Sequence, residues 1–229
     1  MLQTHIVPML ESMVAMEPHL PFRDRKDAGE QLSELLSEYK GKPDVLILAL
    51  VRGGIVVGQV LSQKLQLPLH PYIVRKLGHP HNREFALGAI AEGGETYLDE
   101  GSLKVNGLAW SDIDPIIEEE RAELKRRKAT YAVKPRPALA GTTIILTDDG
   151  AATGATLFAA IADLRKAKAK HVIVALPVCP PDTAVKLRRA ADDIVVVETP
   201  RDFMAVGQWY LSFPQISDDE VLSILSATS

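Results

Sequence analysis

The sequence predicts an α/β protein built on an open, doubly wound, mostly parallel sheet of about five strands. Three observations predict this class. Short β-branched apolar runs alternate with longer helical segments, as successive βαβ units require. The runs are continuously apolar rather than alternating, which is typical of strands buried on both faces. With 229 residues and 46% apolar composition, the chain can bury one sizeable core.

The predicted elements follow one another in a regular order. Apolar runs predict strands at 45–51, 71–74, 143–147, 172–178 and 193–197. Apolar residues at helical spacing, with charge between them, predict helices at 27–40, 54–66, 112–130, 154–169 and 182–191. We therefore expect a single domain over residues 21–229, preceded by an N-terminal extension over residues 1–20.

Two regions interrupt the alternation of predicted strands and helices. Residues 77–97 belong to a Gly-rich, polar stretch without clear periodicity, and such a segment is usually a functional loop or a small β excursion. Residues from about 200 to 229 concentrate the aromatic side chains Phe203, Trp209, Tyr210 and Phe213. Of these, Trp209, Tyr210 and Phe213 could pack against the edge of the sheet or stack on a ligand, and the sequence leaves both open.

Charge and composition exclude several classes of protein. The formal net charge of −4 weighs against a dedicated nucleic-acid binder, and the charge run at 118–128 predicts a solvated helix face. The single cysteine, Cys179, excludes an internal disulfide and a cysteine-rich zinc site, and we expect it to be a small buried apolar residue. The N-terminus lacks the basic region of a signal peptide, and no apolar run approaches the roughly 20 residues of a membrane helix. We expect a cytoplasmic protein with no membrane partner.

The stretch ILTDDGAATGAT at residues 145–156 carries the strongest chemical signal. Two acids, Asp148 and Asp149, end a strand, where ligands of open α/β sheets bind. The loop 152–156 then opens a helix, whose backbone N–H groups and dipole favour an anion, and Gly154 permits close approach of the backbone. Ionised carboxylates repel a phosphate, and they only accept hydrogen bonds. Their partner beside an anion site is therefore a group that donates, and the two hydroxyls of a diol can do so. A phosphate next to a diol describes a ribose 5-phosphate.

This stretch resembles the phosphoribosyl-pyrophosphate (PRPP) motif of the type I phosphoribosyltransferases, and the order of elements from about residue 22 to 200 is similar to that family. The resemblance implies that Asp148 and Asp149 bind the ribose hydroxyls and, through these or water, Mg²⁺. It also implies a 5-phosphate loop made of Ala152, Thr153, Gly154, Ala155 and Thr156.

Two further stretches resemble parts of the same family. ALVRGGIVVG, at 49–58, is similar to its pyrophosphate loop, which assigns Arg52, Gly53 and Gly54 to PRPP binding. VRK, at 74–76, is similar to the basic pair before a mobile catalytic loop, which makes Arg75 and Lys76 the candidate catalytic residues on the leaving pyrophosphate. Residues 77–97 would then be a flexible lid and residues 200–229 the hood over the acceptor.

The resemblance implies Mg²⁺-dependent transfer of the 5-phosphoribosyl group from PRPP to a nitrogenous base or related acceptor, with release of pyrophosphate. It implies small-molecule substrates and a homo-oligomer, with a dimer expected. In the family's 6-oxopurine members an Asp precedes the Thr-Gly and serves the base, whereas this chain has Ala152, which argues against hypoxanthine or guanine recognition by that acid. A catalytically silent sensor of PRPP or nucleotides is the alternative, and nucleotide hydrolysis or phosphorolysis is a third possibility.

Overall fold

A computed structural model of the chain describes residues 20–132 and 135–228, and it has the α/β architecture that the sequence predicts. Most of the predicted N-terminal extension lies outside the described residues. Five parallel strands form the central sheet: β1 (Val45–Leu50), β2 (Leu69–Tyr72), β6 (Thr143–Thr147), β7 (His171–Val178) and β8 (Asp193–Glu198). Their spatial order is β2-β1-β6-β7-β8, so the chain winds outwards in both directions from the neighbouring strands β1 and β6.

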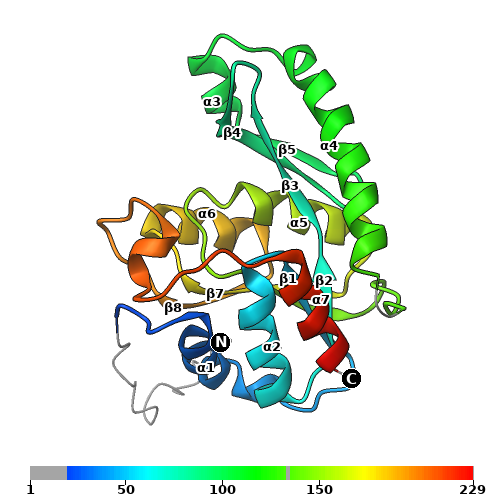
Figure 1. The fold of residues 1–229 in the computed structure, drawn as a ribbon, viewed down its shortest axis with the longest axis vertical. Helices are drawn as coiled ribbons and strands as arrows, with labels where there is room; N and C mark the ends of the chain where they lie inside the picture. The colour runs from blue at the N-terminus through cyan, green and yellow to red at the C-terminus, as the bar shows by residue number, and fades with distance from the viewer. Residues whose placement is uncertain (1–19, 133–134, 229) are drawn as a thin grey trace, which may run out of the picture.

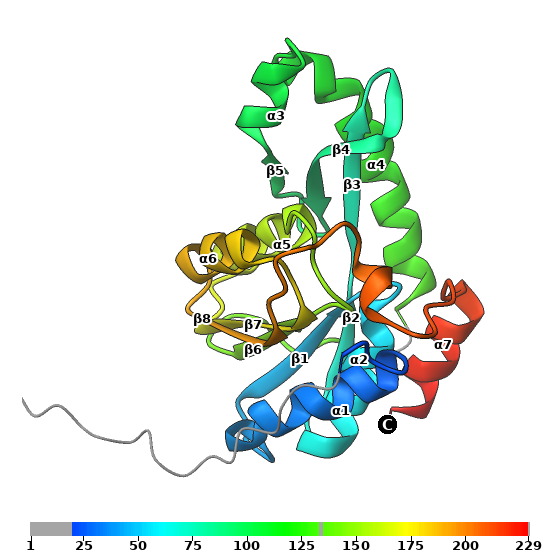
Figure 2. The same ribbon diagram turned by 90° about the vertical axis from the view of Figure 1, so that its left-hand side faces the viewer.

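Helices cover both faces of this sheet, which explains why its strands read as continuous apolar runs. On one face α1 (Arg25–Leu35), α2 (Gly54–Leu65) and α7 (Asp218–Ala227) pack, and on the other face α5 (Ala155–Lys166) and α6 (Pro181–Ala190) pack. Figure 2 shows the two layers on either side of the strands. Val45, Ile47 and Ala49 of β1 belong to one apolar cluster, and the residues between them belong to the other.

A second, antiparallel sheet projects from the first. It consists of β3 (Val74–His79), β4 (Asn82–Ala91) and β5 (Thr96–Leu98), in the order β3-β4-β5. Two helices follow, α3 (Glu100–Val105) and the long α4 (Trp110–Thr130). We call residues 74–130 the arm, which extends away from the central sheet in Figure 1. Segment 77–97, for which the sequence left a loop and a β excursion open, is therefore largely strand.

The observed boundaries correct some predictions. The strand predicted at 71–74 is divided, because β2 ends at Tyr72 and Val74 begins β3 of the other sheet. The helix predicted at 27–40 ends at Leu35, and a short 3-10 turn (Ser37–Tyr39) follows it. Helices α3 and α7 and the 3-10 turn Val206–Trp209 were not predicted, because each is short and lies in a region without clear periodicity.

Candidate functional site

The motif at 145–156 lies where two parallel strands end side by side. Ala49 of β1 is paired with Thr147 of β6, so the residues after each strand leave the sheet at the same edge. Gly53 and Gly54 consequently pack directly against the two acids. A Cβ atom on Gly53 would lie 1.9 Å from Asp149 Oδ2, and one on Gly54 would lie 2.8 Å from the Asp148 Cα. Both glycines are needed here because no side chain fits between the two loops.

The two acids are partly buried, and their environments differ. Burial, and then the neighbouring charge of Asp149, raises the pKa of Asp148 well above its usual value. Burial also raises the pKa of Asp149, although Arg25 opposes that effect. Lys76 likewise opposes the rise at Asp148. Without a ligand, the site therefore disfavours two adjacent full charges.

Asp149 is held by Arg25, which the sequence patterns did not indicate, and by Tyr210 of the predicted hood. Arg25, from the first turn of α1, donates from Nε to Asp149 Oδ2 at 2.8 Å, and its side chain is only 7% exposed. The Tyr210 hydroxyl donates to the main-chain carbonyl of Asp149. The one sequence signal for Arg25 is its position on the apolar stripe of α1, seven residues before Leu32.

The predicted 5-phosphate loop has the form of an anion site. Gly154 precedes the first residue of α5 with φ +77°, a conformation that strongly favours glycine. Ala152 and Thr153 are exposed and Thr156 is half-buried, so the start of the helix is accessible. The Thr183 hydroxyl donates to the Ala152 carbonyl at 2.6 Å and fixes the loop from behind. The orphan N–H groups at this helix start suit a phosphate.

A cavity of about 1080 Å³ joins most of the predicted site residues. Its lining includes Arg52, Arg75, Lys76, both acids of the motif and all of 152–156. Gly53 and Gly54 are not part of the lining and act as packing partners of the acids. The volume slightly exceeds the usual range for ligand pockets, about 300–1,000 Å³, which leaves room for a sugar phosphate and a second molecule.

The cationic side chains predicted to bind pyrophosphate reach this cavity from different elements. Arg52 follows β1 after a cis peptide bond and lies 3.7 Å from Asp218 of α7. Arg75 Nε donates to Glu120 Oε2 of α4 at 2.6 Å. Lys76 is exposed, and no ion pair involves it within residues 20–132 and 135–228. The arm therefore contributes both Arg75 and Lys76 and the carboxylate that holds Arg75.

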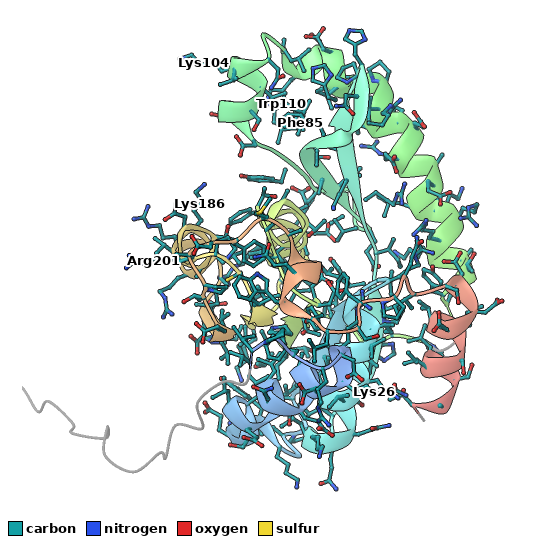
Figure 3. All side chains as sticks on the ribbon, turned by 60° about the vertical axis from the view of Figure 1, so that its left-hand side comes forward. Lys26, Phe85, Lys104, Trp110, Lys186 and Arg201 are labelled. Atoms are coloured by element: carbon teal, nitrogen blue, oxygen red, sulfur yellow. The ribbon has the colours of Figure 1, made fainter. Side chains whose placement is uncertain are left out.

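The remaining walls come from the arm and from the predicted hood. Phe85 of β4, labelled in Figure 3, is 45% exposed and lines the cavity with Met204, Val206 and Phe213. Of the three aromatics considered for stacking, Phe213 reaches the cavity, whereas Tyr210 is buried and Trp209 is not part of the lining. Neighbouring aromatics of one segment thus differ, since Tyr210 packs in the interior and Phe213 lines the cavity.

The donor set of the cavity fits a magnesium ion that is bound mainly by substrate. Asp148 and Asp149 offer carboxylate oxygens, the hard ligands that Mg²⁺ prefers. Within the described residues, no group of three His, Cys, Asp or Glu side chains could hold a metal ion. Mg²⁺ commonly takes one or two carboxylates and completes its shell with water and substrate phosphates.

Other expectations from the sequence can be placed as well. Cys179 is completely buried after β7, as expected, and burial raises the pKa of its thiol to about 12. The charge run 118–128 lies on α4, and most of its charged side chains are exposed. No helix in the described part of the chain is long and apolar enough to span a membrane.

Comparison with known proteins agrees with this geometry. Residues 24–207 match the profile of the phosphoribosyl transferase domain. A Mycobacterium tuberculosis protein named "Putative phosphoribosyl transferase Rv0571c" is 40% identical over 205 residues, which cover 89% of this chain and 46% of that protein. The chain thus spans about half the length of the curated relatives it matches.

Solved structures extend the comparison. The crystal structure of TT1426 from Thermus thermophilus is 38% identical with a TM-score of 0.74, covering 91% of this chain and 99% of that chain. The structure of the AQ2163 protein from Aquifex aeolicus shares the fold at 12% identity, with a TM-score of 0.50 and coverage of 84% and 83%.

Proposed function

Because the chain belongs to the phosphoribosyl transferase family, we propose that it transfers the 5-phosphoribosyl group of PRPP to a nitrogenous acceptor and releases pyrophosphate. The observation that carries this proposal is the shared cavity that contains the acid pair, the loop before α5 and the cations Arg52, Arg75 and Lys76. The three groups match the diol, the 5-phosphate and the pyrophosphate of one ligand. Small-molecule substrates and a homodimer in the cytoplasm belong to the same proposal.

In this mechanism the protein binds and orients both reactants. The acceptor nitrogen uses its lone pair to form a bond to C1 of the sugar, the bond from C1 to the pyrophosphate oxygen breaks, and pyrophosphate leaves with that electron pair. The transition state resembles an oxocarbenium ion, as in glycoside cleavage. Loop 152–156 holds the 5-phosphate, and the carboxylates accept from the ribose hydroxyls. Arg75 and Lys76 stabilise the charge that develops on pyrophosphate.

Mg²⁺ is the cofactor that this proposal includes. Asp148 and Asp149 would hold it, directly or through the ribose hydroxyls and water, and it would neutralise charge on the leaving group. Phe85 lies within residues 77–97, close in the chain to Arg75 and Lys76, so a movement of this segment towards the hood would bring an apolar wall over the sugar and exclude water.

A silent sensor of PRPP is the second candidate, and one observation favours it. Both candidate arginines already hold carboxylates, Arg52 with Asp218 and Arg75 with Glu120. A sensor needs these cations only to bind the ligand, whereas a transferase must also hold them on the pyrophosphate while its negative charge develops.

Two measurements test the proposal and separate the candidates. Calorimetry with PRPP, with and without Mg²⁺, tests binding, and absence of Mg²⁺-dependent binding would overturn both candidates. Pyrophosphate release is then measured across a panel of purine and pyrimidine bases. Release with at least one base supports the transferase. Tight PRPP binding without release from any base supports the sensor.

A further inference from the structure

A second cavity lies beside β2, the strand at one edge of the central sheet. Its volume is about 270 Å³, and none of the described residues lines both this cavity and the larger one of the candidate site. It lies where α7 and the end of α4 come next to β2 in Figure 1. The volume is just below the range of about 300–1,000 Å³ that is usual for ligand pockets, so it suits a molecule of one or two rings.

The walls of this small cavity are mainly apolar. Leu69 of β2, Ile73 and Leu225 of α7 line it, and each is almost completely buried. Tyr131, at the end of α4, lines it too, but its hydroxyl is engaged because it donates to Asp218 Oδ1 at 2.6 Å. An apolar ring would displace water from these walls, which favours binding.

One carboxylate is buried in the wall of the small cavity. The Glu92 side chain is only 2% exposed, and its Oε2 atom accepts the Ile73 N–H at 2.9 Å. Arg136 Nη2 lies 2.5 Å from Oε1 and balances its charge, yet Oε1 accepts no well-formed hydrogen bond from the described residues. A buried acceptor without a hydrogen bond is costly, so a ligand that donates to Oε1 gains more than its apolar contacts provide.

The charges around Glu92 restrict the ligand further. Lys128 Nζ lies 4.0 Å from Glu92 Oε1, and Arg136 lies beside the same atom. These two cations disfavour a ligand that is itself a cation, and the buried carboxylate disfavours an anion next to it. A neutral molecule with an N–H group avoids both penalties.

We propose that the small cavity is a second ligand site, which binds a small, neutral, mainly apolar heterocycle whose N–H group donates to Glu92 Oε1. This site is independent of the proposed function, because its lining contains none of the residues assigned to PRPP. Its ligand therefore neither replaces PRPP nor has to be the acceptor of the phosphoribosyl group.

The first test compares two ligands of the same size and shape by NMR titration of the wild-type protein. Indole has one N–H donor and is neutral, whereas benzofuran has a ring oxygen in its place and no donor. We expect indole to bind about tenfold more tightly, as a hydrogen bond to a charged group implies. Equal affinity, or no binding of indole up to its solubility limit, overturns the proposal.

The second test assigns this preference to Glu92. Glu92→Gln keeps the shape of the side chain, and its amide oxygen can take the Ile73 N–H, which turns a donor instead of an acceptor towards the ligand. We expect the preference for indole over benzofuran to fall to about twofold or less in this variant. A preference that stays at the wild-type value overturns the assignment of Oε1 as the acceptor.

The third test locates the bound indole. Leu225→Trp fills the small cavity from α7 and should weaken indole binding at least about tenfold. Ala227→Trp is the matched control, because Ala227 is exposed at the end of the same helix and does not line the cavity, and we expect wild-type affinity. Phe85→Ala alters only the larger cavity and should also leave indole binding unchanged.

Indole binding that is lost in Phe85→Ala places the ligand in the larger cavity and overturns the proposal. Thermal unfolding of each variant shows whether the compared proteins are folded. If Leu225→Trp does not fold, the comparison of Glu92→Gln with Phe85→Ala decides the location, since only one of the two cavities contains each residue.

Discussion

Substitution of Gly53 by alanine tests the close contact between the two loops at the carboxyl end of the sheet. The new Cβ would lie 1.9 Å from Oδ2 and 2.7 Å from Cγ of Asp149, and no Cβ tolerates such distances. The backbone is not the obstacle, because Gly53 has φ −60° and ψ −43°. The Asp149 carboxylate must move by about 1 Å or more, and its 2.8 Å contact with Arg25 then breaks.

The magnitude follows from the buried pair. Separation of a buried ion pair costs about 3–5 kcal/mol. Alanine has a higher helix propensity than glycine, so at a helix start it stabilises the fold by up to about 1 kcal/mol. We therefore expect a net loss of about 2–4 kcal/mol and a Tm lower by about 5–15 °C. Thermal unfolding by circular dichroism measures this loss, and calorimetry should show weaker PRPP binding.

A control uses a glycine near a helix start whose new methyl group needs only a small adjustment. A Cβ on Gly101 of α3 would lie 3.2 Å from Asp99 Oδ1, and a shift of a few tenths of an ångström by that side-chain end relieves the contact, so Gly101→Ala should change the Tm by no more than about 2 °C. A Gly53→Ala protein that unfolds within about 1 °C of wild type and binds PRPP equally well would refute the reasoning.

Three further predictions follow from individual side chains. The raised pKa of Asp148 means that its protonated form stabilises the fold, and this stability is lost as pH rises through the folded-state pKa. Asp148→Asn should therefore be more stable than wild type by about 1–3 kcal/mol at pH 8, with the gain shrinking as pH falls, while it binds PRPP poorly; denaturant unfolding at pH 5 and 8 checks this. Arg75→Gln should reduce pyrophosphate release at least about tenfold with little change in ribose 5-phosphate affinity, because Arg75 faces the leaving group; equal loss of both would contradict its assignment. Cys179, with its pKa raised by burial to about 12, should resist iodoacetamide at pH 8 in the folded protein and react in denaturant, as mass spectrometry would show.

The sequence predicts the central sheet well because its strands carry their own signal. Residues such as Ile47 and Leu48 are buried on opposite faces of one strand, and only a sheet covered on both sides produces such a run. The motif 145–156 is equally local, since its acids, loop and helix start are consecutive in the chain. Both predictions rest on neighbours in sequence.

The parts that the sequence did not predict depend on contacts between distant segments. Arg25 and Asp149 are 124 positions apart, and Arg25 and Pro214 are 189 apart. In the sequence near Arg25, these contacts are indicated only by the position of a charged residue on the apolar face of α1. The arm is a similar case, because β3 and β4 contain glycines and polar residues, and they pack against α4 and α5, which follow later in the chain.

The charge balance of the cavity bears on why a protein places two acids beside an anion site. The described lining residues include five cations, Arg52, Arg75, Lys76, Arg83 and Arg127, and four carboxylates, Glu119, Glu120, Asp148 and Asp149. Such a lining is close to neutral, whereas PRPP carries several negative charges. Binding therefore requires an exchange of partners. Phosphate oxygens must replace carboxylates on the arginines, and a ligand-borne cation must offset the remaining charge. On this account, affinity for PRPP should fall steeply without Mg²⁺ but only modestly with added monovalent salt, because the exchanged pairs are partly buried and weakly screened.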